Sequence, residues 1–147
     1  MPYASEAELA ARLGGPLYAR LTDRDDATTP DANQGALLLV QGEALLNSYV
    51  GRRYAVPIDT STNASLAALL RVRTLDLAEY LAWRQSPFVS DVPARVTQLG
   101  REVFAFLQQV ATGQLDLPGP PPSAAASGSM QVRATPRRFT HEELDQL

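Results

Sequence analysis

Ala64-Ser-Leu-Ala-Ala-Leu-Leu-Arg-Val-Arg-Thr-Leu-Asp-Leu-Ala-Glu-Tyr-Leu-Ala-Trp-Arg-Gln85 is the stretch that decides the fold of this chain. Its large apolar side chains recur at spacings of three and four residues, which is the periodicity of an amphipathic helix. Pro87 follows, and a proline inside a helix removes a hydrogen bond and clashes with the preceding turn. The stretch therefore predicts a long helix over residues 64–85.

Two further long helices are predicted on either side of this one. The first runs from Ala32 to Gly51, with Asp31 as its N-cap. The second runs from Asp91 to Gly113, with Pro93 just inside its start. Its predicted core stripe consists of Val96, Leu99, Val103, Phe106 and Val110.

Two short helices are predicted ahead of the long ones. Ser5 and Glu8 have the spacing of a capping box, so a helix starts there and ends at Gly14. Pro16 suits the first turn of a second short helix, which runs through Leu21. The predicted fold class is mainly α: a small bundle of three long helices plus short N-terminal helices, with an extended C-terminal arm.

The connections carry two candidate sites. Residues 22–31 are predicted to form a loop that contains Asp23, Asp25 and Asp26. Residues 52–58 are predicted to be extended, because the residue before a proline disfavours the helical region. This segment, which begins with two arginines, could either pack on its own bundle or present an edge to a neighbouring molecule. The candidate partner-binding residues of the segment are Arg52, Arg53 and Tyr54.

The C-terminal part divides the chain into three units: a helical domain over residues 1–117, a Pro/Gly/Ala/Ser linker over 118–129, and an interaction arm over 130–147. Within the arm, residues 130–134 suit a short strand and residues 140–143 a last helical turn. A tethered segment with little apolar surface does not fold alone, and arginine, phenylalanine and leucine are typical interface anchors. The candidate partner-binding residues of the arm are Arg133, Arg137, Arg138, Phe139, Leu144 and Leu147. The alternative is a tail that binds nothing.

Composition limits the classes of function. The chain has 147 residues, a net charge of -3 and no cysteine, so it has no overall field that attracts nucleic acid and no thiolate metal site. It carries no basic, apolar leader of the signal-peptide type and no apolar run of about 20 residues, so no membrane association is expected.

Residues that could carry chemistry are scarce. The single histidine, His141, lies in the arm with no second ligand at metal-binding spacing, and the three aspartates of the 22–31 loop lack the glycine and glutamate of a calcium-binding loop. We therefore expect no catalytic residues, no cofactor and no metal, and hence no enzymatic activity. Arg71 and Arg73 are predicted to pair with Asp76 and Glu79 along their own helix, and Trp83, Phe104 and Phe106 to be core aromatics.

Several short motifs, taken in order, resemble the Mu-like prophage family of head-tail joining proteins. They are Met1-Pro-Tyr-Ala-Ser-Glu-Ala-Glu-Leu9, Leu21-Thr-Asp-Arg-Asp25, Gly51-Arg-Arg-Tyr-Ala-Val-Pro57, Leu75-Asp-Leu-Ala-Glu-Tyr80 and Arg137-Arg-Phe-Thr140. The third long helix departs most from the family pattern, since residues 96–103 have fewer charged and aromatic side chains than the family often has there.

This resemblance implies a structural neck adaptor of a tailed phage. Its partners would be the portal protein, neighbouring copies in a ring matching the portal's twelvefold symmetry, and a tail-side neck or tail terminator protein. Its place would be the virion neck, after assembly in the host cytoplasm. Two alternatives stay open. The first is a protein that contacts DNA in the genome channel through its arginines, and the second is a metal-dependent enzyme centred on the loop aspartates. A transient contact with DNA in the channel would also be compatible with the adaptor.

Overall fold

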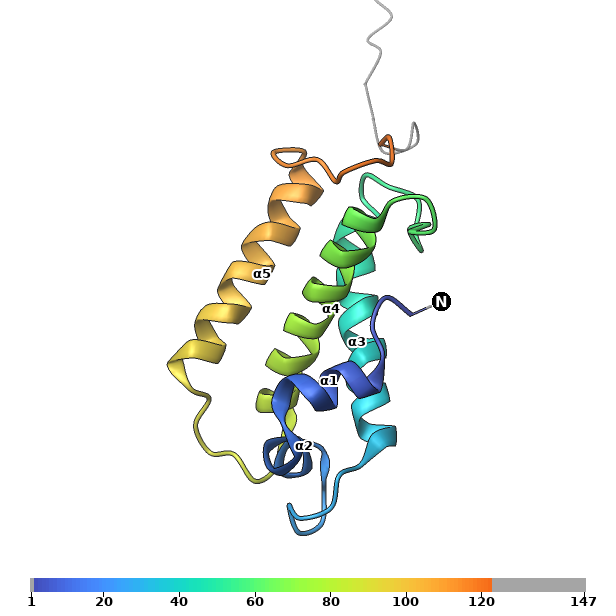
Figure 1. The fold of residues 1–147 in the computed structure, drawn as a ribbon. Coiled ribbons are helices and arrows are strands. Elements are labelled where there is room, and N and C mark those ends of the chain that lie inside the picture. The colour runs from blue at the N-terminus through green and yellow to red at the C-terminus, as the bar shows by residue number, and fades with distance from the viewer. Residues whose placement is uncertain (1, 123–147) are drawn as a thin grey trace, which may run out of the picture.

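The computed structural model describes residues 2–122, and within them the chain forms five helices and no strands (Figure 1). In chain order the helices are α1 (Glu6–Leu13), α2 (Gly15–Thr22), α3 (Ala32–Val50), α4 (Ala64–Gln85) and α5 (Ala94–Thr112). The predicted mainly α fold class is confirmed. The predicted linker beyond Pro122 and the whole arm lie outside the described residues.

The helix ends follow the capping signals in the sequence. The Ser5 hydroxyl accepts the Glu8 backbone N–H, and the Glu8 carboxylate accepts the Ser5 backbone N–H at 2.8 Å, which completes the predicted capping box. The Asp31 carboxylate accepts two backbone N–H groups in the first turn of α3, and the Asn63 side chain caps α4.

Helix α4 is the centre of the bundle. It packs between α3 and α5, while α1 and α2 lie across its C-terminal half (Figure 1). Residues 74–79 are all buried, because this part of α4 is covered by other helices on every side. Charged groups here must find partners inside the protein, since a buried ion without one is costly.

Two apolar clusters fill the bundle. The cluster near the α3–α4 loop joins the C-terminal part of α3 to the N-terminal part of α4 and to α5, around Leu46, Leu70 and Leu107. The other joins α1 and α2 to the opposite halves of α3 and α4, around Leu9 and Leu38. The short N-terminal helices are therefore part of the core.

Helix α5 starts later than predicted. It begins at Ala94, with Pro93 as its N-cap rather than inside the helix, so the predicted start at Asp91 is wrong. The physical reason is that Val92 precedes a proline and is disfavoured in the helical region. The buried stripe of α5 also differs from the predicted one. Leu99 and Phe106, which were predicted to be buried, are half-buried, and Gly100 and Leu107 are buried instead.

The prediction of an extended segment over residues 52–58 is wrong for its first half. The backbone N–H groups of Arg53 and Tyr54 both donate to the Val50 carbonyl at 3.0 Å, so the chain turns back on the end of α3. Tyr54 and Ile58 are buried in the core. Tyr54 and Ile58 of this segment thus pack on its own bundle, as one of the two alternatives had it, and contact of the remaining residues with a neighbour stays a prediction.

Candidate functional site

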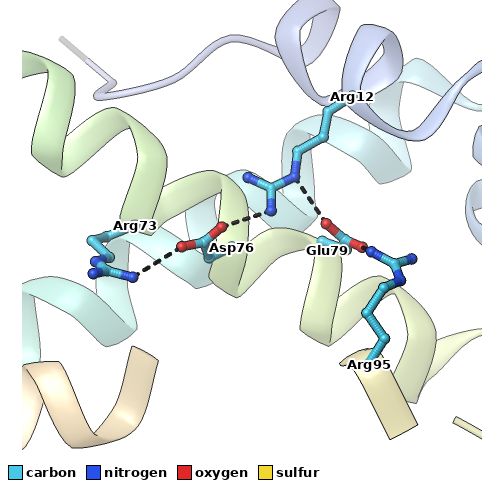
Figure 2. A network of polar contacts seen from close by, with 5 residues as sticks. All are labelled: Arg12, Arg73, Asp76, Glu79 and Arg95. Atoms are coloured by element: carbon cyan, nitrogen blue, oxygen red, sulfur yellow. Dashed lines mark hydrogen bonds and ion pairs between the residues drawn. The ribbon is translucent and has the colours of Figure 1, made fainter. Parts of the chain in front are cut away.

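Two carboxylates of α4, Asp76 and Glu79, are buried at the side where α1 and α5 meet it. Their side chains are 6% and 3% exposed. Three arginines from three helices surround them, and together these five residues form the ion network shown in Figure 2. The network contains three positive and two negative groups.

Arg12 from the last turn of α1 joins the two carboxylates. Its Nη2 lies 2.6 Å from Asp76 Oδ1, and its Nε lies 2.8 Å from Glu79 Oε2. A guanidinium can do this because its N–H groups diverge in a rigid fork. Burial by itself lowers the pKa of Arg12, but the hydrogen bonds and charges of the two carboxylates outweigh that effect and raise it. Arg12 thus fixes α1 on the bundle as a permanent cation.

Arg73 and Arg95 complete the pairing on the outer side. Arg73 Nη1 lies 3.3 Å from the second oxygen of Asp76, and Arg95 Nη1 lies 3.2 Å from the second oxygen of Glu79. The Arg73 guanidinium also stacks 4.6 Å from the centre of the Phe106 ring, which connects α4 to α5. Each buried carboxylate is held by two arginines.

The predicted ion pairs within α4 are correct only in part. The pair between Arg73 and Asp76 is observed, but Arg71 pairs with Glu8 of α1 at 3.4 Å, and Glu79 pairs with other helices. The sequence contained one signal for this arrangement, namely acidic residues in the middle of a mostly apolar helix. The arginines that join them from α1 and α5 could not be identified from spacing along α4.

A second polar cluster holds the end of the described chain against the turn after α3. Arg53 Nη1 lies 2.8 Å from Asp116 Oδ1 and 3.4 Å from the Val110 carbonyl, near the C-terminal end of α5. A cation at this end of a helix is favourable, because the last carbonyls lack partners within the helix. The Tyr54 hydroxyl accepts the Leu117 backbone N–H at 3.0 Å.

The same cluster extends one residue further along the chain. Asn63 donates from its side-chain amide to the Pro118 carbonyl at 3.1 Å, and Leu117 is the last buried residue of the described chain. We call the contacts of Arg53, Tyr54 and Asn63 with residues 116–118 the exit clasp. The clasp fixes residues 116–118 on the bundle.

The predicted partner-binding residues near this turn have different environments. Arg52 is exposed, with its guanidinium 5.6 Å from the centre of the Tyr49 ring, whereas Arg53 is half-buried in the exit clasp and Tyr54 is 2% exposed. Tyr54 therefore serves the interior of the bundle, and partner binding by Arg52 and Arg53 stays a prediction. The arm's candidates all lie outside the described residues: Arg133, Arg137, Arg138, Phe139, Leu144 and Leu147.

The N-terminal segment is fixed at the same end of the bundle. The Tyr3 hydroxyl accepts the Ile58 backbone N–H at 2.7 Å and donates to the Asn47 side chain at 3.1 Å. Burial, together with the nearby charge of Glu43, raises the pKa of Tyr3, so the hydroxyl is kept protonated.

The aspartates of the 23–31 loop organise the loop itself. The Asp23 carboxylate accepts the backbone N–H groups of Asp25, Thr28 and Thr29 at 2.9, 3.0 and 3.0 Å. These hydrogen bonds lower the pKa of Asp23 well below its ordinary value. Within residues 2–122, no group of three histidine or acidic side chains is arranged as a metal site would require.

The predicted core aromatics lie at the edge of the core. Trp83, Phe104 and Phe106 are half-buried and pack against the two apolar clusters. The Phe104 ring is nearly perpendicular to that of Tyr80, at 5.8 Å between centres.

A membrane-spanning segment needs a long and predominantly apolar helix, and none of the helices in residues 2–122 meets both requirements.

Comparison with known proteins gives one family. The model of a family described as "Bacteriophage Mu, Gp36" matches residues 3–134, which include all five helices and the exit clasp. A search of curated proteins gives no match.

Proposed function

Because this chain belongs to the bacteriophage Mu Gp36 family, we propose that it is the neck adaptor of a tailed phage, which docks as a ring on the portal and links the capsid to the tail. Family membership over nearly the whole chain is the observation that carries this proposal, and it makes the chain a structural or virion-related phage protein. The adaptor position, the ring and the portal contact are the proposed part.

The architecture supports a structural role. The ion network ties α1, α4 and α5 together, and the exit clasp holds residues 116–118 at one defined place on the bundle. A rigid bundle with a segment leaving from a fixed point suits a head-to-tail ring, because each subunit then needs two different contact patches. In the proposed ring the bundle supplies one patch and residues 130–147 supply the other, either to the portal or to an adjacent copy. No catalytic activity is proposed.

The pairing of several arginines within the chain favours the adaptor role over DNA binding. Five of those described, namely Arg12, Arg53, Arg71, Arg73 and Arg95, already face carboxylates of the same chain. A phosphate backbone would have to compete with those partners, and the net charge of the chain is -3. Salt-sensitive binding of duplex DNA by the purified protein would reverse this preference.

The test is assembly of a shortened chain on the portal. The chain should end at Pro122 rather than at Leu117, because Pro118 belongs to the exit clasp and its loss would disturb the fold. We expect the shortened chain to keep the helical circular dichroism of the full chain and to lose ring formation on the purified portal in electron micrographs. Normal rings from the shortened chain would contradict the role given to residues 130–147, and no association of the full chain with the portal would contradict the adaptor proposal.

A further inference from the structure

The outward face of α3 is unusual because it is apolar and almost free of charge. Glu43 is the only charged residue among the 19 of this helix. Leu37 and Val40 are 47% and 62% exposed, and Ala44 continues the same row one turn further. A helix on the surface of a bundle normally presents charged and polar groups to water. Helix α3 instead has the composition of a helix that is covered on its outer side too.

The apolar face continues beyond the helix into the chain around it. A shallow pocket of about 380 Å³ lies where the N-terminal segment and the α3–α4 loop meet α3, and it is lined by Pro2, Val40, Glu43, Ala44, Asn47 and Pro57. The side chain of Val56 lies against Gly51, directly after the end of α3, and is 42% exposed. We define the α3 face as Pro2, Leu37, Val40, Ala44, Val56 and Pro57.

Exposed apolar side chains gather on this face within the part of the chain that the structure describes. Of the five large hydrophobic residues exposed there, Leu37, Val40 and Val56 belong to it. The other two, Val72 on α4 and Leu115 after α5, stand apart from it in different elements. Contiguous exposed apolar surface marks a site of interaction, whereas single exposed residues are ordinary.

We propose that the α3 face binds residues 130–147 of a neighbouring copy of this chain. The proposal rests on the proposed ring, and it names the surface that receives the arm. The exit clasp ties residues 116–118 to Arg53, Tyr54 and Asn63, and Val56 and Pro57 lie between these in the same loop. Residues 116–118 therefore lie beside the α3–α4 loop, which carries one end of the face that we propose as the receptor, and Figure 1 shows the segment after α5 next to that loop.

Length allows this contact. Twenty-five residues follow Pro122, and an extended chain spans up to about 3.3 Å per residue, or about 80 Å in total. Helix α3 has 19 residues, which at about 1.5 Å per residue make about 28 Å. The segment can therefore lie along the whole of α3 and still leave about 50 Å of extended chain for the crossing between two bundles.

The chemistry of the two surfaces is complementary. Phe139, Leu144 and Leu147 are apolar anchors of the kind that fill shallow apolar pockets. Two arginines, Arg137 and Arg138, directly precede the phenylalanine. The α3 face offers them one carboxylate, Glu43, at the rim of its pocket. An aromatic anchor next to a cation thus meets an apolar pocket next to an anion.

The absence of cysteine makes a direct test possible. One full-length chain carries Val40→Cys and another carries Phe139→Cys; the two are mixed under ring-forming conditions and treated with a short bis-maleimide. Val72→Cys replaces Val40→Cys in the control, because Val72 is also a half-exposed helical valine but lies on α4. We expect a crosslinked heterodimer at several times the yield of the control.

Three results would overturn the proposal. The first is equal yield from the Val40→Cys and Val72→Cys mixtures. The second is no crosslink in either mixture while rings form, which would place the arm elsewhere but leave the adaptor role intact. The third comes from a separate chain that carries both Val40→Cys and Phe139→Cys: a crosslink within that chain, with no heterodimer from the mixture of single variants, would mean that the arm covers its own bundle.

A second measurement tests the charge complementarity. Glu43→Gln should lower the yield between Val40→Cys and Phe139→Cys by up to about fivefold at low salt, which is the range of an exposed ion pair, and by less at high salt. An unchanged yield at low salt would remove the part given to Arg137 and Arg138. The variant keeps the size and shape of the side chain, so the fold is preserved.

Discussion

Arg12 is the residue whose removal should expose the energetics of the bundle most clearly. The perturbation is Arg12→Met, which keeps most of the aliphatic length and removes the guanidinium that joins Asp76 to Glu79. Breaking a buried ion pair by removing one partner costs about 3–5 kcal/mol. Here each carboxylate keeps one more arginine, and the Arg12 side chain is 29% exposed, so the expected loss is about 2 kcal/mol.

Arg95→Met is the matched comparison. Arg95 pairs with the same Glu79 at 3.2 Å, but its side chain is 69% exposed. Exposed pairs contribute about 0–1 kcal/mol because water and salt screen them. The same chemical change at the two positions should therefore differ in cost by more than about 1 kcal/mol.

The assay is urea unfolding followed by circular dichroism, with the slope against urea concentration expected to be unchanged. For a domain of this size a loss of about 2 kcal/mol corresponds to a fall of roughly 6–10 °C in the melting temperature. Combining Arg12→Met with Glu79→Gln in a double-mutant cycle should give a coupling of about 1–2 kcal/mol. Equal, small losses for Arg12→Met and Arg95→Met would refute the reasoning, because they would mean that burial of the carboxylates does not strengthen these pairs.

Two further predictions concern the packing of the helices and the loop before α3. A methyl group at Gly42 would lie 3.2 Å from the Thr74 carbonyl oxygen, so Gly42→Ala should destabilise the bundle by about 1–3 kcal/mol, and calorimetry that finds no loss of stability would contradict this. The lowered pKa of Asp23 means that its stabilising contribution is present above the ordinary aspartate pKa and is lost as the pH falls toward the folded-state value. Stability measured at decreasing pH should therefore fall less steeply in Asp23→Asn than in the parent chain, and parallel curves would argue against the loop hydrogen bonds as the cause.

The helices could be predicted from the sequence because their ends are marked by local chemistry. Ser5 and Glu8 start α1, Asp31 starts α3, and the periodic leucines with Pro87 define α4. Such signals act within a few residues, so no knowledge of the tertiary structure is needed. The start of α5 also follows a local rule, because the residue before Pro93 disfavours the helical region and the helix therefore begins after the proline.

The sites could not be predicted to the same extent, because they depend on which helices meet. Asp76 and Glu79 stood out as charges in an apolar helix, but Arg12 is more than sixty positions away in the sequence and only packing brings it there. The sequence left open whether Tyr54 packs on the bundle or faces a neighbour, and it is the turn after Val50 that carries the side chain inward. The apolar face of α3 resembles a core stripe in the sequence, since periodicity does not tell which apolar residues remain uncovered.

The exit clasp has a mechanical consequence. A pull on the chain beyond Pro122 would first load the contacts of Asn63 with Pro118 and of Tyr54 with Leu117. Both anchoring residues lie in the loop between α3 and α4, so the force would be shared among α3, α4 and α5 instead of peeling the last turn of α5 from its end. In a particle whose parts are held under tension, the bundle would respond to that load as one body.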